Sequence, residues 1–128
     1  MDKQDQLDEV AHVQSKISEV KTYMIQVVFE PLEIIKDFTS VLTRTDVLMS
    51  ELEDVIVRQR LLEFNAQVRS TIRLLLRFYK DHYTGCDDKD ELPHTECKCD
   101  EAQQIVIDRI NMMYEQLEVV RSKVQMHN

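Results

Sequence analysis

The sequence contains very few of the residues that interrupt helices and build turns. Its 128 residues include one glycine, two prolines and no tryptophan. A sheet protein of this length needs turn residues at nearly every strand connection and usually carries many glycines and prolines. The scarcity of both argues against a β-rich fold and favours long helices.

Long apolar runs and a secretory signal are also missing. No stretch approaches 18 consecutive apolar residues, so no membrane span is predicted. The N-terminus has neither the basic start nor the apolar run of a signal peptide. Three cysteines, an odd number, fit a reducing compartment better than a disulfide framework. We therefore expect an intracellular protein of the cytoplasm or nucleus, with a processed, secreted helical signalling protein as an alternative.

Catalytic motifs are absent from the sequence as well. It contains no glycine-rich phosphate loop, no His-Glu-x-x-His pair and no Gly-x-Ser-x-Gly turn. The long helical segments leave little irregular chain from which a preorganised pocket could be built. We expect a protein that is not an enzyme.

Charge is plentiful but unevenly distributed. Charged residues make up 31% of the chain and apolar residues 43%, a balance typical of a folded protein. The net charge of −8 argues against a nucleic-acid partner, because the phosphate backbone favours a basic surface. One basic stripe stands out, since Arg69, Arg73, Arg77 and Lys80 project within about 80° of one another on a helix. The stripe suits acidic partners or phosphates, although a solvated helix face is the simpler interpretation.

Apolar residues in the first third of the chain recur at alternating spacings of three and four, the pattern of a helix that packs along one side. A second apolar row beside this seam indicates packing against two neighbours. Pro31 falls inside the seam, and because the seam keeps its phase there we expect a kink rather than a break. The seam residues are Val10, Val13, Ile17, Val20, Met24, Val27, Pro31, Ile34, Phe38 and Val41, and the second row is Val28, Ile35 and Leu42.

The next reversal is expected at residues 43–46, where Thr45 or Asp46 would cap a new helix. One unbroken helix through this point is the alternative, because no glycine marks the preceding helix end. The second helix would run to about residue 82 and the last from about residue 101 to residue 126. Expected inward positions of the second helix are Leu48, Leu52, Val55, Leu62, Val68, Ile72, Leu75, Phe78 and Tyr79.

The segment between these two helices contains the only glycine and all three cysteines. Zinc prefers four tetrahedral Cys or His ligands, which Cys86, His94, Cys97 and Cys99 would supply, with His82 as a substitute. One residue separates Cys97 from Cys99, whereas two residues are usual between paired ligands. Three reduced, exposed cysteines with no cofactor are therefore the competing interpretation, and a disulfide between Cys86 and Cys97 is a third.

These patterns predict a single all-α domain over residues 1–128. It would contain a helix of residues 3–43 kinked near 31, a helix of residues 46–82, an acidic Cys/His loop of residues 84–100 and a helix of residues 101–126. The predicted architecture is an elongated antiparallel three-helix bundle with a long helical hairpin. If the chain breaks at Pro31 instead, residues 32–43 fold back and a compact four-helix bundle results.

Unequal helix lengths lead to the functional hypothesis. At about 1.5 Å of rise per residue, the last helix would end level with Pro31 and leave the hairpin beyond it projecting. That projection would carry more apolar side chains than two helices can hide, so we expect it to bind partner helices or a second copy, as in an adaptor or complex subunit. A zinc-binding regulatory module built on the Cys/His loop is the alternative. The expected partner-binding residues are Ile34, Ile35, Phe38, Val41, Leu42, Leu48, Met49, Leu52 and Val55.

Overall fold

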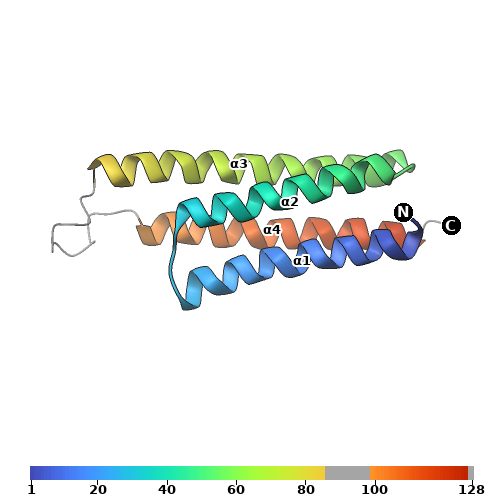
Figure 1. Ribbon diagram of the computed structural model, residues 1–128, viewed down its shortest axis with the longest axis horizontal. Helices are drawn as coiled ribbons and strands as arrows, with labels where there is room; N and C mark the ends of the chain where they lie inside the picture. The colour runs from blue at the N-terminus through green and yellow to red at the C-terminus, as the bar shows by residue number, and fades with distance from the viewer. Residues whose placement is uncertain (86–98, 127–128) are drawn as a thin grey trace.

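The computed structural model describes residues 1–85 and 99–126, and within these ranges it contains four α-helices and no strand (Figure 1). The helices are α1 (Lys3–Gln26), α2 (Pro31–Glu51), α3 (Val55–Gly85) and α4 (Cys99–Met126). Each helix runs antiparallel to the one before it, and α4 closes the ring by packing against α1. The fold is an up-down-up-down four-helix bundle. α3 has 31 residues and α2 has 21, so the end of α3 extends beyond the start of α2.

The break between α1 and α2 contradicts the predicted kink in a helix of residues 3–43. The three-helix count is therefore wrong, and the four-helix alternative is confirmed. Glu30 has an extended backbone (φ −113°, ψ 102°), because the following proline ring disfavours the helical region for the residue before it. Val27 and Val28 are β-branched, which lowers the helix propensity of this segment further. Pro31 then begins α2 at a position where no helical hydrogen bond needs its missing N–H.

The reversal between α2 and α3 also differs from the prediction. Residues 43–46 lie inside α2, and the chain turns at residues 52–54. Asp54 caps α3, because its Oδ1 accepts hydrogen bonds from the backbone N–H groups of Ile56 (2.8 Å) and Val57 (3.0 Å). The capping signal at Thr45 and Asp46 is used for contacts between α2 and α3 instead.

The core is one continuous apolar column to which all four helices contribute. The predicted seam of the first third of the chain is buried from Val10 to Met24 and again from Pro31 to Val41, whereas Val27, at the break between α1 and α2, is 66% exposed. None of the described helices combines the length and apolar character needed to cross a membrane. The core residues are Val10, Val13, Ile17, Val20, Met24, Ile34, Phe38, Val41, Leu48, Leu52, Val57, Leu61, Phe64, Val68, Leu75, Val106, Ile110, Met113, Leu117, Val120 and Val124.

A polar pair is buried beside this column, between α2 and α3. The hydroxyl of Thr45 donates to Asn65 Oδ1 at 2.7 Å, and Asn65 Nδ2 donates to Asp46 Oδ1 at 3.2 Å. Thr45 and Asn65 are both fully buried. Because a slip of one helix along the other would leave these groups unpaired in an apolar environment, the pair fixes the register of α2 against α3.

Candidate functional site

The predicted partner-binding residues do not form a projecting tip. α2 lies back along α1 and α3 instead of extending α1, and this turns the predicted surface inward (Figure 1). Of the predicted set, only Val55 stays fully on the surface, with 75% of its area exposed. The predicted overhang beyond Pro31 is therefore wrong, because α2 packs along α1 and α3. Ile34, Phe38, Val41, Leu48 and Leu52 belong to the buried core, and Ile35, Leu42 and Met49 are partly buried against it.

The predicted zinc ligands fall mostly outside the described residues, where Cys86, His94 and Cys97 lie. Cys99 is the first residue of α4 and His82 belongs to α3, but neither side chain is among those described. Among the side chains that are described, no three His, Cys, Asp or Glu groups gather as a metal site requires. The zinc hypothesis stays a prediction.

The basic stripe lies on the solvent side of α3, where Arg69, Arg73, Arg77 and Lys80 are all exposed. Arg69 approaches Asp46 of α2, with 3.8 Å between Nη2 and Oδ1, which is a weak surface ion pair. Arg73 and Arg77 form no ion pair or hydrogen bond with the described part of the chain. Their charges are available to a group outside the bundle.

A second row of regularly spaced side chains runs along the same side of α3. Its residues are all exposed and follow one another at alternating spacings of four and three, which aligns them in one stripe. Leu62 and Leu76 are 46% and 48% exposed, although their neighbours Leu61 and Leu75 are fully buried on the inner side. We call this row the outer seam, and it consists of Val55, Gln59, Leu62, Ala66, Arg69, Arg73, Leu76 and Lys80.

Net charge also distinguishes α3 from its neighbours. α3 contains six arginines and lysines and two carboxylates, a net charge of +4. The other three described helices are net negative, at −1 for α1, −2 for α2 and −2 for α4. The bundle therefore presents one basic side, and the outer seam runs along it.

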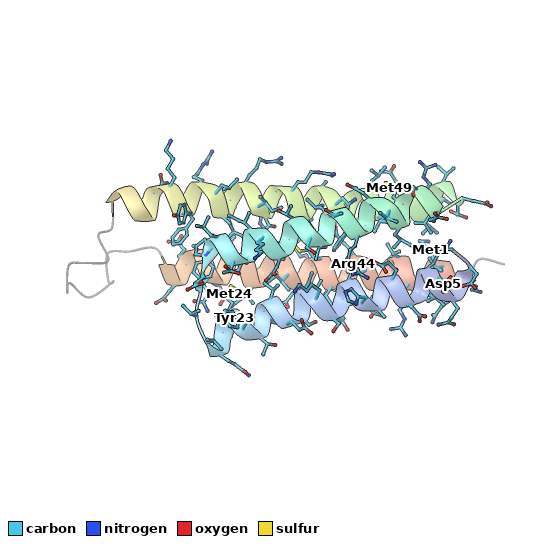
Figure 2. The ribbon with its side chains drawn as sticks, in the orientation of Figure 1. Met1, Asp5, Tyr23, Met24, Arg44 and Met49 are labelled. Carbon is cyan, nitrogen blue, oxygen red and sulfur yellow. The ribbon has the colours of Figure 1, made fainter. Side chains whose placement is uncertain are left out.

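A groove between the end of α1 and the start of α2 has the opposite charge. It encloses about 290 Å³ and is lined by Val20, Tyr23, Glu30, Glu33, Ile34 and Asp37. The two aliphatic lining residues belong to the core, whereas Tyr23 is half-exposed at the end of α1 (Figure 2). Lys16 reaches Asp37 at 3.6 Å, and within the described chain no cation pairs with Glu30 or Glu33. We call this cavity the α1–α2 groove.

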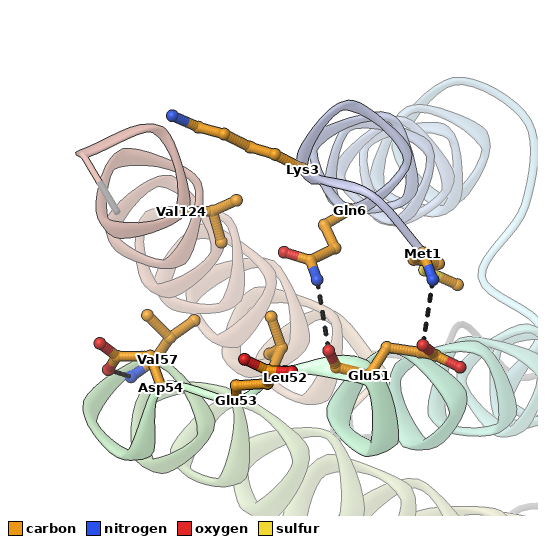
Figure 3. Close-up of a pocket in the computed structure, with 9 residues that line it drawn as sticks. All are labelled: Met1, Lys3, Gln6, Glu51, Leu52, Glu53, Asp54, Val57 and Val124. Carbon is orange, nitrogen blue, oxygen red and sulfur yellow. Dashed lines mark hydrogen bonds and ion pairs between the residues drawn. The ribbon is translucent and has the colours of Figure 1, made fainter. Parts of the chain in front are cut away.

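A larger pocket of about 450 Å³ lies at the other end of the bundle (Figure 3). Glu51 Oε2 accepts a hydrogen bond from the amine of Met1 at 3.0 Å, and this bond raises the pKa of the amine. Lys3 extends toward α4 and donates to the backbone oxygen of Gln125 at 2.6 Å, while Asp54 caps α3. These polar residues thus join the helix ends to one another, so we assign the pocket to the packing of the bundle.

The outer seam was only partly visible in the sequence. Val55 and Leu62 were expected to point inward, and both are exposed. α3 carries two rows of residues at spacings of three and four: Val55 and Leu62 belong to one row, and Leu61, Phe64 and Val68 belong to the other, which fills the core. Recognising two rows in the sequence would have separated the exposed residues from the buried ones. The α1–α2 groove had no sequence signal, because it exists only where the chain breaks and folds back.

No family model matches the sequence, and neither the curated proteins nor the solved structures provide a match. Function has to be inferred from the outer seam and the α1–α2 groove.

Proposed function

We propose that the chain is a non-enzymatic interaction module, an adaptor or complex subunit, that binds an acidic amphipathic helix of a partner protein along the outer seam. The observation that carries this proposal is the placement of two half-exposed leucines, Leu62 and Leu76, in one row with Arg69 and Arg73. Leucines at this spacing offer anchors to another helix. Arginines between them select a partner that carries carboxylates.

The dimensions of the outer seam suit a helix of ordinary length. Residues 55–80 span about 38 Å at about 1.5 Å per residue, or about seven helical turns. Val55, Leu62 and Ala66 give the first half an apolar character, and Arg69 and Arg73 begin a basic second half. A partner helix that complements this order has apolar residues opposite the first half and carboxylates opposite the second.

Two other occupants fit the outer seam less well. The outer seam of a second copy supplies no carboxylate to the arginines, and a parallel arrangement would place the arginines of both chains opposite one another, where unscreened like charges are destabilising. A nucleic-acid backbone would engage the arginines but would leave Leu62 and Leu76 without apolar contacts, and the net charge of −8 opposes it. An acidic helix uses both kinds of side chain.

A designed peptide tests the proposal directly. The probe is a helix of about four heptads, the length of the outer seam, with leucines opposite the first half of the seam and opposite Leu76, and glutamates opposite Arg69, Arg73 and Lys80. Facing glutamates keep the probe from pairing with itself. A control peptide carries lysine in place of each glutamate. Fluorescence anisotropy should show salt-sensitive binding of the glutamate probe and binding of the lysine peptide at least about tenfold weaker.

Charge reversal on the protein provides the second arm of the test. Arg69→Glu combined with Arg73→Glu should weaken probe binding about tenfold or more, because both carboxylate contacts become repulsive. The matched control, Lys36→Glu with Arg121→Glu, makes the same change in net charge at exposed positions of α2 and α4. It should leave binding within about twofold once the salt concentration is held at a physiological value. Equal losses in the two variants, or no binding to the original protein, contradict the proposal.

A further inference from the structure

We propose that the α1–α2 groove receives the basic half of α3 from a second copy of this chain, so that copies associate head to tail. The basic half of α3 is Arg69, Arg73, Leu76, Arg77 and Lys80. This inference rests on the proposed function, because it uses the same side of α3 as a docking surface. It goes further by naming a partner that carries the required carboxylates.

The chemistry of the α1–α2 groove fits a long basic side chain. Val20 and Ile34 supply apolar surface inside a cavity of about 290 Å³, and three carboxylates line it with them. An arginine places its methylene stem on apolar surface and its guanidinium against carboxylates, which the guanidinium binds through two parallel hydrogen bonds. The ring of Tyr23 adds an aromatic surface on which a guanidinium can stack.

The charges of the two surfaces have the same spacing. Glu33 and Asp37 are four residues apart on α2, where Asp37 also has a weak surface ion pair with Lys16 at 3.6 Å, and Arg73 and Arg77 are four residues apart on α3. Both intervals correspond to about 6 Å of rise along a helix, so two aligned helices bring both pairs together. Leu76 lies directly beside Arg77 in sequence and is half-exposed, which leaves it free to contact the apolar part of the groove.

Each surface also has charges that the bundle itself does not neutralise. Within the described chain, Arg73 and Arg77 have no acidic partner and Glu30 and Glu33 have no basic one. The two surfaces cannot satisfy each other in one molecule, because the groove lies between α1 and α2 and the basic half of α3 lies on the outer side of another helix. A second copy removes this restriction.

Such a contact joins two different surfaces and is therefore heterologous. Both surfaces lie toward the end of the bundle where α1 connects to α2, so copies can pack side by side there (Figure 1). Every dimer keeps one free groove and one free basic surface. Association consequently continues until a ring closes or a chain of copies forms.

Sedimentation velocity on the full chain tests this arrangement. The average mass should rise with protein concentration and fall when salt screens the ion pairs. Two variants, Arg73→Glu with Arg77→Glu and Glu30→Lys with Glu33→Lys, should each weaken association about tenfold or more, because each makes the contact repulsive. An equimolar mixture of the two should associate again, since the reversed surface of each matches a surface of the other. The control Lys36→Glu with Arg121→Glu should associate as the original protein does.

Circular dichroism of each variant checks that its helix content is retained. If a reversal reduces that content, glutamine at the same pairs of positions removes the charges without introducing opposite ones. Each glutamine variant should then associate less than the original protein, and their mixture should form dimers through the unchanged groove of one variant and the unchanged basic half of α3 of the other. A monomeric original protein, association that survives either pair of substitutions, or a mixture that stays monomeric overturns the inference.

Two outcomes separate this inference from the proposed function. If the original protein is monomeric but binds the glutamate probe through Arg69 and Arg73, self-association is wrong and the proposed function stands. If mixing restores association while the probe does not bind, the head-to-tail contact is supported and an acidic partner helix is excluded.

Discussion

The inner face of α2 and the outer seam of α3 have the same spacing, alternating steps of four and three, but opposite surroundings. On α2 the row runs from Ile34 through Phe38 to Leu48 and is buried in the core. On α3 it leaves Leu62 and Leu76 half-exposed. The sequences differ at the remaining positions of each row, because α2 has an uncharged, hydrogen-bonded Thr45 and α3 has arginines. Apolar spacing identifies a helix face, and the charges within the row distinguish a buried face from an exposed one.

The largest expected effect comes from truncating the buried row. Phe38→Ala should lower the free energy of unfolding by about 3–5 kcal/mol, because Phe38 is 0% exposed and its removal leaves a cavity that the bundle cannot close completely. Leu62→Ala on the outer seam is the control and should cost about 1 kcal/mol or less. Denaturant unfolding monitored by circular dichroism measures both. Equal losses in the free energy of unfolding would mean that Leu62 is as buried as Phe38, and the contrast between the two helix faces would be wrong.

The polar pair between α2 and α3 should give the next largest effect. Asn65→Ala removes the amide that contacts Thr45 and Asp46 and should cost about 1–3 kcal/mol. The lower part of that range is expected, because the hydroxyl of Thr45 also lies 3.1 Å from the backbone oxygen of Leu42. Replacing both partners, Thr45→Val with Asn65→Leu, should restore most of the lost stability. A double variant as unstable as the single one would show that packing volume, not hydrogen bonding, sets the cost.

On the outer seam, binding should change much more than stability. Leu76→Ser should alter the free energy of unfolding by less than about 1 kcal/mol, since the side chain is already half-exposed. It should nevertheless weaken binding of the glutamate probe about tenfold, because an apolar anchor is lost. Val119→Ser, at a similarly exposed position of α4, is the control for binding. If the two variants bind the probe equally well, Leu76 is not an anchor.

The smallest effect is expected between α1 and α2 at Arg44, which is labelled in Figure 2 and pairs with Glu9 of α1. Arg44 Nε and Nη2 donate to the two oxygens of Glu9 at 2.7 and 3.0 Å, and this pairing raises the pKa of the Arg44 guanidinium above its ordinary value. The ion pair stabilises the fold fully at pH values below the ordinary pKa of arginine, and this stabilisation is lost only when the pH rises through the raised pKa. Changing the pH near neutrality should therefore not change the contribution of Arg44 to stability. Arg44→Ala should cost about 0.5 kcal/mol, less at high salt. A loss of several kcal/mol in thermal unfolding would mean that Arg44 supports the packing of the two helices.

The helices themselves could be predicted from sequence more reliably than their connections. The seams of α1 and α4 are visible because each follows one uninterrupted period. The sequence around Pro31 does not decide between a kink and a break. The apolar spacing continues unchanged through a kinked helix, and it also continues when the chain breaks and the second helix folds back against the same core. The cap at Asp54 resembles the expected cap at Thr45, whose hydroxyl instead donates to Asn65, about twenty residues away in the sequence.

The candidate surfaces show the same limit. The basic stripe could be predicted, because the periodicity of one helix defines it. Leu62 could not be assigned to the surface, because the residues near it in its row, Val55 and Ala66, are uncharged and the arginines of the outer seam begin only at Arg69. The α1–α2 groove requires the fold-back after Val28, which brings Tyr23 beside Glu33.

Amide chemical shifts of the isotope-labelled protein, recorded during titration with the glutamate probe, test the central claim most directly. The outer seam as a docking surface predicts that the largest shifts follow Leu62, Arg69, Arg73 and Leu76 along α3. The amides of the inner face of α2 should change little. Shifts concentrated at Phe38 and Leu48 instead, or spread evenly over the four helices, would contradict the claim.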